Sequence, residues 1–203
     1  MSWAIWITGP PGSGKTTLAR AVAKGLEAWG VPVKVLELDE IRRILTPHPT
    51  YSEWERELVY RALVVMAKLL TEAGVPVLID ATAHRRAWRE LARELIPLFA
   101  EVQLMCPLDV CREREQARRW GHAPRGVYAR AGRPGATVPG VDVPYEEPLH
   151  AELTLRTDTT DPWTQVQEVL HLARRLVRCA HAERVGLGRP DAERRVLCES
   201  ESG

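Results

Sequence analysis

A glycine-rich turn near the start of the chain constrains the fold more than any other feature. An apolar run from Trp3 to Thr8 leads into Gly9-Pro-Pro-Gly-Ser-Gly-Lys-Thr-Thr17, and a helical period of apolar residues follows. This order of strand, glycine-rich turn and helix is that of the phosphate-binding loop (P-loop). The motif residues and both flanking elements agree, which argues against a chance glycine-rich turn.

Each part of this loop has a task in holding a polyphosphate. The turn glycines allow positive φ angles and close approach of the backbone to phosphate, and the helix N-terminus adds its dipole. We expect Lys15 to reach the β- and γ-phosphates of ATP, and the Thr16 hydroxyl to bind Mg²⁺. The predicted ATP-binding residues are Gly9, Gly12, Ser13, Gly14, Lys15, Thr16 and Thr17.

Strands and helices alternate along the rest of the chain. Expected strands cover 33–38, 76–79, 101–105 and 153–156, and expected helices cover 17–29, 52–73, 85–96, 109–120 and 162–180. Ser52 and Glu55 have the spacing of a capping box at a helix start. Alternation of this kind gives a parallel sheet with helices on both faces. The predicted fold class is α/β, a P-loop NTPase-type three-layer sandwich with a parallel sheet and a lid segment.

The chain has the size of one domain. Its 203 residues are 45% hydrophobic, which suffices for one substantial core. Residues 121–148 are rich in Gly, Pro, Arg and Tyr, show little periodicity and have the length of an active-site lid. We expect a P-loop domain over 1–180 with its lid at about 121–148, and a polar tail over 181–203 whose composition is compatible with disorder.

Composition argues against several classes of partner. The formal net charge of +1 gives no global field that would favour nucleic acid or a membrane surface. No run of eighteen apolar residues occurs, and the chain does not begin with a signal-peptide pattern. The cysteines, Cys106, Cys111, Cys179 and Cys198, form no Cys-x-x-Cys pair. We therefore expect a cytoplasmic protein with reduced thiols and a small-molecule substrate.

Two aspartates follow expected strands and are candidates for chemistry. Asp39 stands where a strand delivers residues to the ligand-binding edge of an open α/β sheet, and we interpret it as the general base. The alternative for Asp39 is a helix N-cap. Arg42, one helical turn on, is placed to hold an anionic acceptor. Asp80 follows four apolar residues, as a Walker-B carboxylate does, and is either a Mg²⁺ ligand through water or a turn residue.

Arginine and tryptophan are the other conspicuous residues. We expect one or two of the arginines in and before the lid to contact a ligand and the rest to be solvated. These arginines are Arg112, Arg114, Arg118, Arg119, Arg125, Arg130 and Arg133. We interpret Trp3, Trp6, Trp29, Trp88 and His84 as packing or surface residues, because they form no RNA-binding aromatic pattern.

Several segments besides the P-loop carry a resemblance to a known family over roughly Trp3 to Leu176. Asp39-Glu-Ile-Arg42 is similar to Asp-x-Ile-Arg, Tyr51-Ser-Glu-Trp-Glu-Arg56 to Phe-Ser-x-x-Asp-Arg, and Ala81-Thr-Ala-His-Arg85 to Ile-Ser-Pro-His-Arg. The lid contributes Arg125-Gly-Val-Tyr128 and Gly140-Val-Asp-Val-Pro-Tyr-Glu-Glu-Pro148, which resemble Lys-Gly-Leu-Tyr and Gly-Ile-Asp-x-Pro-Tyr-Glu-x-Pro. These are motifs of the adenylyl-sulfate kinase (APS kinase) family.

The resemblance implies an ATP-dependent kinase of sulfate assimilation. Its reaction would phosphorylate the 3′-hydroxyl of adenosine 5′-phosphosulfate (APS) to give 3′-phospho-APS (PAPS), with ATP and Mg²⁺ as cofactors, Asp39 as base and Lys15 on the phosphates. The substrate-binding positions that it implies are Arg42, Arg56, Ala81, Thr82, Arg125, Gly126 and Val138. The metal-binding positions are Thr16 and Asp80, and a homodimer stays open.

The departures from the family pattern fall near the acceptor. Val59 stands in place of an asparagine, and Val138 replaces the phenylalanine expected to stack on the adenine of APS. The nearest aromatic candidates in matching segments are Tyr51 and Tyr128. Two other functions stay open at this point: a P-loop kinase for another small-molecule hydroxyl, including a polynucleotide-kinase-like one, and a non-catalytic nucleotide-binding switch.

Overall fold

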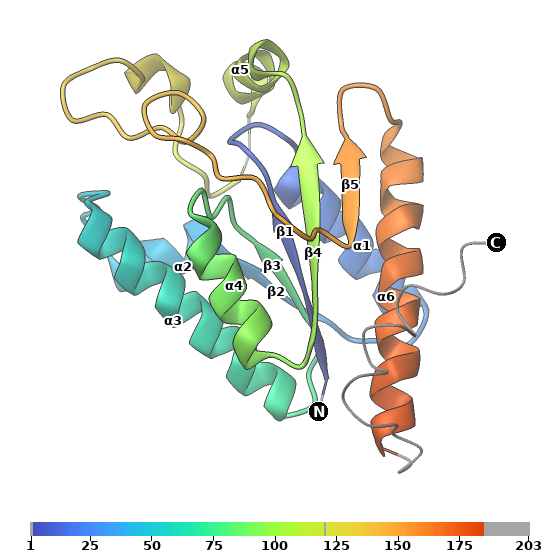
Figure 1. The fold of residues 1–203 in the computed structure, drawn as a ribbon. Helices are drawn as coiled ribbons and strands as arrows, with labels where there is room; N and C mark the ends of the chain where they lie inside the picture. Colours follow the sequence, from blue (N-terminus) through green and yellow to red (C-terminus); the bar gives the residue numbers. More distant parts are fainter. Residues whose placement is uncertain (1, 120, 185–203) are drawn as a thin grey trace.

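The computed structural model describes residues 2–119 and 121–184, which form an α/β fold around a five-stranded parallel sheet (Figure 1). The strands, in sheet order, are β2 (Lys34–Glu37), β3 (Val77–Asp80), β1 (Trp3–Thr8), β4 (Leu98–Met105) and β5 (Leu153–Arg156). The helices are α1 (Lys15–Ala28), α2 (Leu38–Leu45), α3 (Glu53–Glu72), α4 (Arg86–Leu95), α5 (Leu108–Ala117) and α6 (Pro162–Arg184). The predicted fold class is confirmed.

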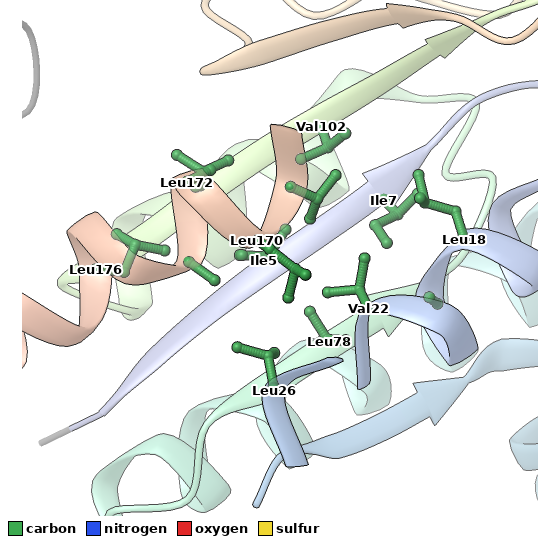
Figure 2. Close-up of a cluster of buried hydrophobic side chains, with 14 of the residues drawn as sticks. Ile5, Ile7, Leu18, Val22, Leu26, Leu78, Val102, Leu170, Leu172 and Leu176 are labelled. Atoms are coloured by element: carbon green, nitrogen blue, oxygen red, sulfur yellow. The ribbon is translucent and has the colours of Figure 1, made fainter. Parts of the chain in front are cut away.

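The central strand β1 explains why the sheet is covered on both faces. All six of its residues are buried, so its sequence is a continuous apolar run rather than an alternation. Ile5 and Ile7 join the core cluster under α1 and α6, as Figure 2 shows. Ala4 and Trp6 point to the opposite face, into the cluster under α3 and α4. Each face therefore has a hydrophobic core of its own.

The start of α3 is fixed by a cap that differs in part from the expected capping box. The Ser52 hydroxyl accepts a hydrogen bond from the Glu55 backbone N–H at 3.3 Å, as predicted. The Glu55 carboxylate accepts instead from the N–H groups of Thr50 and Tyr51 and from the Thr50 hydroxyl. This arrangement holds the 50–52 turn against the helix and brings Tyr51 to the ligand-binding edge of the sheet.

Some element bounds differ from the expectation. β4 begins at Leu98 rather than Glu101, and α5 ends at Ala117 rather than at position 120. α6 continues to Arg184, four residues into the segment that we expected to be tail. Residues 185–203 of that predicted tail lie outside the described residues. No helix among the described residues is long and apolar enough to cross a membrane.

The lid lies over the carboxyl ends of the strands (Figure 1). Between residues 121 and 148 the regular structure consists of a 3₁₀ turn at Tyr128–Arg130 and an isolated bridge between Pro139 and Val143. Its return arm, residues 140–148, is held by α4 and by the loop before that helix. Arg89 of α4 donates to the Glu146 carbonyl, and the Glu146 N–H donates to the His84 carbonyl. The segment is therefore ordered by contacts rather than by periodicity.

Candidate functional site

A cleft of about 880 Å³ opens at the carboxyl ends of the strands. The P-loop, the β2–α2 junction, the end of β3 and the lid each contribute to its walls. The connection from β1 to β2 leads to one side of β1, and the connection from β3 to β4 crosses to the other side. The cleft therefore lies at the topological switch point of the sheet, where open α/β folds bind ligands. The sequence-predicted edge is therefore the observed one.

The P-loop glycines have two different tasks. Gly9, Gly12 and Gly14 all have positive φ angles, 149°, 81° and 100°. A Cβ at Gly9 would lie 2.7 Å from the Leu104 carbonyl oxygen, and one at Gly12 would lie 2.3 Å from the Cys111 carbonyl oxygen. At Gly14 a Cβ would meet nothing within 4 Å. Gly14 therefore has open space before it, whereas Gly9 and Gly12 are required by packing against β4 and α5, a role that we had not predicted.

The N-terminus of α1 is suited to an anion. Gly14 caps this helix without a side-chain hydrogen bond, and its first turn holds no acidic residue. The first backbone N–H groups of a helix have no partner within it. The buried Ser13 hydroxyl also lacks a hydrogen-bond partner among the described residues. Free donors, an open approach and a positive dipole end fit the polyphosphate of a nucleotide.

Lys15 adds a cation to this cradle. Its ammonium donates to the carbonyls of Gly9 and Pro10, both at 3.0 Å, which leaves a third N–H for a phosphate oxygen. Burial lowers the pKa of Lys15, and the charges of Asp80 and Asp39 oppose this shift. The lysine is thus flanked by the two aspartates that the sequence singled out.

Asp39 lies in the first turn of α2, facing the cleft. The N-cap position belongs to Glu37, so the interpretation of Asp39 as a helix cap is wrong. Burial raises the pKa of Asp39, while the cations Lys15 and Arg42 pull it down. A carboxylate that is partly desolvated and held beside a phosphate-binding lysine can accept a proton from a hydroxyl in the cleft.

Asp80 ends β3 and is 5% exposed. Burial raises its pKa to about 6, whereas Lys15 and a hydrogen bond with the Thr16 side chain lower it. A hydroxyl and a carboxylate in contact beside a phosphate cradle are the oxygen donors that Mg²⁺ takes, with waters and phosphate oxygens completing its shell. The residues present therefore fit a Mg²⁺ ion at Thr16 and Asp80.

Arg42 and Arg56 line the other end of the cleft, where both guanidinium groups lie over the ring of Tyr51. Arg42 is buried in an ion pair with Glu55 at 2.9 Å. Arg56 donates to the Tyr51 carbonyl at 3.0 Å and to the Thr137 carbonyl at 2.8 Å. Arg56 thus joins α3 to the lid, and Arg42 presents a fixed positive charge beside an aromatic ring.

The loop after β3 forms the floor between these two ends. Ala81 and Thr82 line the cleft, and their carbonyls accept from the Trp6 indole at 3.0 Å and the Thr8 hydroxyl at 2.7 Å. Ala83 has a φ of 42°, which is strained for a residue with a side chain. Its N–H donates to the Tyr60 hydroxyl at 2.9 Å. Hydrogen bonds from β1 and α3 therefore hold this loop in its strained conformation.

The lid residues that we had predicted to contact substrate have different positions. Val138 lines the cleft but is 7% exposed, because it packs with Cys111 and Tyr128 in a small core of its own. The Tyr128 hydroxyl donates to the Pro11 carbonyl at 2.7 Å. Arg125 and Gly126 do not line the cleft as the described residues form it, and Arg125 donates to the Arg119 carbonyl instead. Contact of Arg125 or Gly126 with a substrate stays a prediction.

Of the seven arginines, Arg114, Arg118, Arg119 and Arg130 line the cleft. Arg114 is engaged with the carbonyl of Thr157, at 2.7 Å. Arg118 donates to the Pro124 carbonyl at 2.5 Å and is close enough to lower the pKa of both Lys15 and Asp39. Arg118 is therefore the arginine best placed to face a phosphate.

Sequence reasoning missed two groups at the site. Glu37 and His122 meet across the cleft mouth, with 3.2 Å between Oε1 and Nδ1. Arg89 of α4 donates to the Ala83 carbonyl and so helps to hold the strained loop in place. Arg89 and His122 belong to no short motif, whereas Glu37 stands two residues before Asp39 at the end of a strand, which was the available signal for it. The tryptophans were interpreted correctly, since Trp3, Trp6 and Trp88 are buried and Trp29 is on the surface.

Comparisons with known proteins agree on one family. The family model of adenylylsulphate kinase matches residues 1–156. A probable adenylyl-sulfate kinase of Archaeoglobus fulgidus is 43% identical over 79% of this chain and 99% of its own length. One of Pyrococcus abyssi is 37% identical over 86% of this chain and 96% of its own length.

A solved structure agrees over the same region. The Mycobacterium tuberculosis APS kinase CysC, in complex with AMPPNP and APS, superposes with a TM-score of 0.74 at 31% identity. The match covers 85% of this chain and 98% of the CysC chain. On the family model, the relatives and the fold together, this chain belongs to the adenylylsulphate kinase family.

Proposed function

We propose that this protein transfers the γ-phosphoryl group of ATP to the 3′-hydroxyl of APS, giving PAPS and ADP. The observation that carries the proposal is the meeting of Lys15, Asp39 and Asp80 in one cleft, with a row of cations on the acceptor side. Support also comes from the CysC structure, whose ligands are APS and the ATP analogue AMPPNP.

The residues of the cleft divide the work of phosphoryl transfer. The hydroxyl oxygen attacks the γ-phosphorus, the bond from that phosphorus to the β-phosphate oxygen breaks, and ADP leaves. Asp39 accepts the hydroxyl proton, and Lys15 stabilises the negative charge on the β- and γ-phosphates during the transfer. Mg²⁺ held by Thr16 and Asp80 would neutralise charge on the phosphate oxygens. Positioning and charge neutralisation therefore supply most of the catalysis.

The end of the cleft opposite the P-loop would recognise the acceptor. APS carries an anionic phosphosulfate and a flat adenine, and Arg42, Arg56 and Tyr51 offer two cations and a ring. Tyr51 lines the cleft whereas Tyr128 does not, which makes Tyr51 the better candidate for stacking on the adenine. Val138 has no aromatic ring, and we assign the aromatic contact with the adenine to Tyr51 instead.

Two further proposals concern the setting of the enzyme. We place it in the cytoplasm, since ATP is found there and Cys106 and Cys111 are free thiols. We also propose a homodimer through the exposed apolar side chains of α3. These are Trp54, Leu58, Val65 and Leu69. Light scattering on the purified protein distinguishes a dimer from a monomer, and Leu58→Glu should shift a dimer toward monomer.

A coupled assay of ADP release tests the proposed reaction. The purified protein with ATP and Mg²⁺ should release ADP rapidly when APS is added, with one PAPS formed for each ADP. Turnover that depends on another hydroxyl compound but not on APS would move the assignment to a different small-molecule kinase. Tight ATP binding without turnover on any acceptor would support a nucleotide-binding switch instead.

A further inference from the structure

We propose that Glu37, Glu40 and His122 form a binding site for a divalent transition-metal ion of the Zn²⁺ class, separate from the Mg²⁺ site at Thr16 and Asp80. The three side chains come from two segments that face each other across the mouth of the cleft. Glu37 and Glu40 belong to the β2–α2 junction, and His122 belongs to the lid.

The geometry brings one ligand atom of each side chain together. The Nδ1 atom of His122 lies 3.2 Å from Glu37 Oε1 and 4.0 Å from Glu40 Oε2. All three ligand atoms lie within 4.8 Å of one another. Atoms that each bind an ion at about 2.0–2.2 Å lie roughly 3–4 Å apart, so a small inward movement of the exposed Glu40 side chain completes the set. The cluster is therefore nearly preformed.

The donor set selects the kind of metal. One imidazole nitrogen and two carboxylate oxygens are ligands that Zn²⁺ accepts, and three protein ligands leave a position for water. Mg²⁺ prefers oxygen ligands with near-octahedral geometry, so a histidine in the set disfavours it. The two sites of the cleft thus differ in chemistry: oxygen donors beside the P-loop, and a nitrogen with two oxygens at the mouth.

A fourth residue orients the buried ligand. Arg20 donates from α1 to Glu37 Oε2 at 2.8 Å and leaves Oε1 directed at His122. A hydrogen bond to the outer oxygen of a metal-binding carboxylate is a common way of fixing its direction. Glu37 is 7% exposed, and Glu40 and His122 are more accessible, so an ion can enter from the solvent side.

A metal ion bound at this site would connect the lid to α2, the helix that bears the proposed base Asp39. Asp39 lies in sequence between Glu37 and Glu40, in the first turn of α2. A metal ion held by these glutamates and His122 would tie the 121–124 part of the lid to that turn. The inference stands apart from the proposed reaction, because metal binding can be measured without turnover.

Titration of the full-length protein with Co²⁺ and Zn²⁺ tests the site. The protein is first stripped with a chelator and dialysed, and Co²⁺ binding is followed by its visible absorption. We expect one equivalent of Co²⁺ to bind, to be displaced by Zn²⁺ and to persist in excess Mg²⁺. His122→Asn and Glu40→Gln should each weaken binding by about tenfold or more, because loss of a group that merely hydrogen-bonds to a metal ligand already costs about 10–100-fold.

Matched variants test three other groups that could bind the metal ion. His48→Asn removes an exposed histidine outside the cluster, Cys106→Ser removes a partly exposed thiol, and Asp80→Asn disables the predicted Mg²⁺ site. All three should bind Co²⁺ as the wild type does. Glu40→Gln changes an exposed side chain, so its thermal unfolding should match the wild type. Equal binding by wild type and His122→Asn, or loss of binding in any of the three controls, would overturn the proposal.

Discussion

Arg89 of α4 and Glu101 of β4 form an ion pair in the interior, with 2.5 Å between Nε and Oε1 and side-chain exposures of 0% and 1%. The same guanidinium donates to the carbonyls of Ala83 and Glu146. One buried arginine therefore joins the sheet, the strained loop at the floor of the cleft and the return arm of the lid.

Breaking this pair should destabilise the protein strongly. Glu101→Gln leaves the buried Arg89 without its counter-charge, and removal of one partner from a buried ion pair costs about 3–5 kcal/mol in the free energy of unfolding. For a chain of this size that corresponds to a fall in Tm of about 6–20 °C. Differential scanning calorimetry measures the shift. An unchanged Tm in Glu101→Gln would contradict the argument.

Lys15→Ala should abolish phosphoryl transfer and leave the fold intact. The ammonium contacts carbonyls of the loop and not the hydrophobic cores, so its loss removes charge from the phosphate cradle alone. ADP release measures the activity, and circular dichroism checks the fold. Wild-type turnover in a correctly folded variant would disprove the role of Lys15.

Asp39→Asn should lower kcat far more than it weakens ATP binding. A positioned general base contributes typically about 10²–10⁴-fold to the rate, and an amide cannot accept the proton. Steady-state kinetics with calorimetric ATP titration separate the two effects. Parallel losses of rate and ATP affinity would instead identify Asp39 as a residue of the nucleotide or metal site.

Tyr51→Leu should raise KM for APS while KM for ATP stays near the wild-type value. Stacking of an aromatic residue on a base is worth about 1–3 kcal/mol, or roughly 5–150-fold in affinity. Val138→Phe is the second test of adenine contact. It should lower KM for APS if the added ring turns from the Cys111 and Tyr128 cluster into the cleft. A KM for APS unaffected by both substitutions would show that the adenine is held elsewhere.

His84 should make the protein less stable as pH falls from about 6.5 to about 4. Burial lowers the pKa of His84 to about 4, with Arg56, Arg85 and Arg89 adding to the shift and Glu146 opposing it. The unfolded chain therefore takes up this proton first, and stability falls with pH across that window, by at most about 3 kcal/mol.

The variant His84→Gln isolates this contribution from that of the carboxylates. A glutamine oxygen can accept from Arg56, whose Nη1 lies 3.4 Å from His84 Nδ1. Urea denaturation of wild type and variant at pH 7.5 and 4.5 gives the comparison. The variant should lose less stability than the wild type between the two pH values; an equal loss would show that His84 is already charged at neutral pH or does not contribute.

Local patterns were sufficient to predict the parts of the site that follow strands. The P-loop and Asp80 stand at the ends of buried apolar runs, and Asp39 closely follows the short strand β2. Parallel strands deliver such residues to one edge. The Ser52 cap was likewise predicted from the spacing of Ser52 and Glu55. The sequence left the strand order open, because order depends on which helices cover which face rather than on any single segment.

Contacts between distant segments could not be predicted from the sequence. The expected start of β4 was three residues late, because α4 ends at Leu95 and only Ile96 and Pro97 separate it from the strand. Arg125 was carried over from a motif, yet the lid lacks periodicity, and its path depends on Arg56 and Arg89 bonding to its carbonyls. The meeting of Glu37 with His122 joins residues 85 positions apart.

The glycines of the P-loop also bear on how nucleotide affinity is achieved. Gly9 and Gly12 press against the carbonyls of Leu104 and Cys111, so neighbouring backbone sets the curvature of the loop. A binding loop that already has its bound shape loses little conformational entropy when the ligand arrives, and more of the contact energy remains as affinity. Substitutions that shift β4 or the start of α5 should therefore weaken ATP binding without touching a phosphate contact.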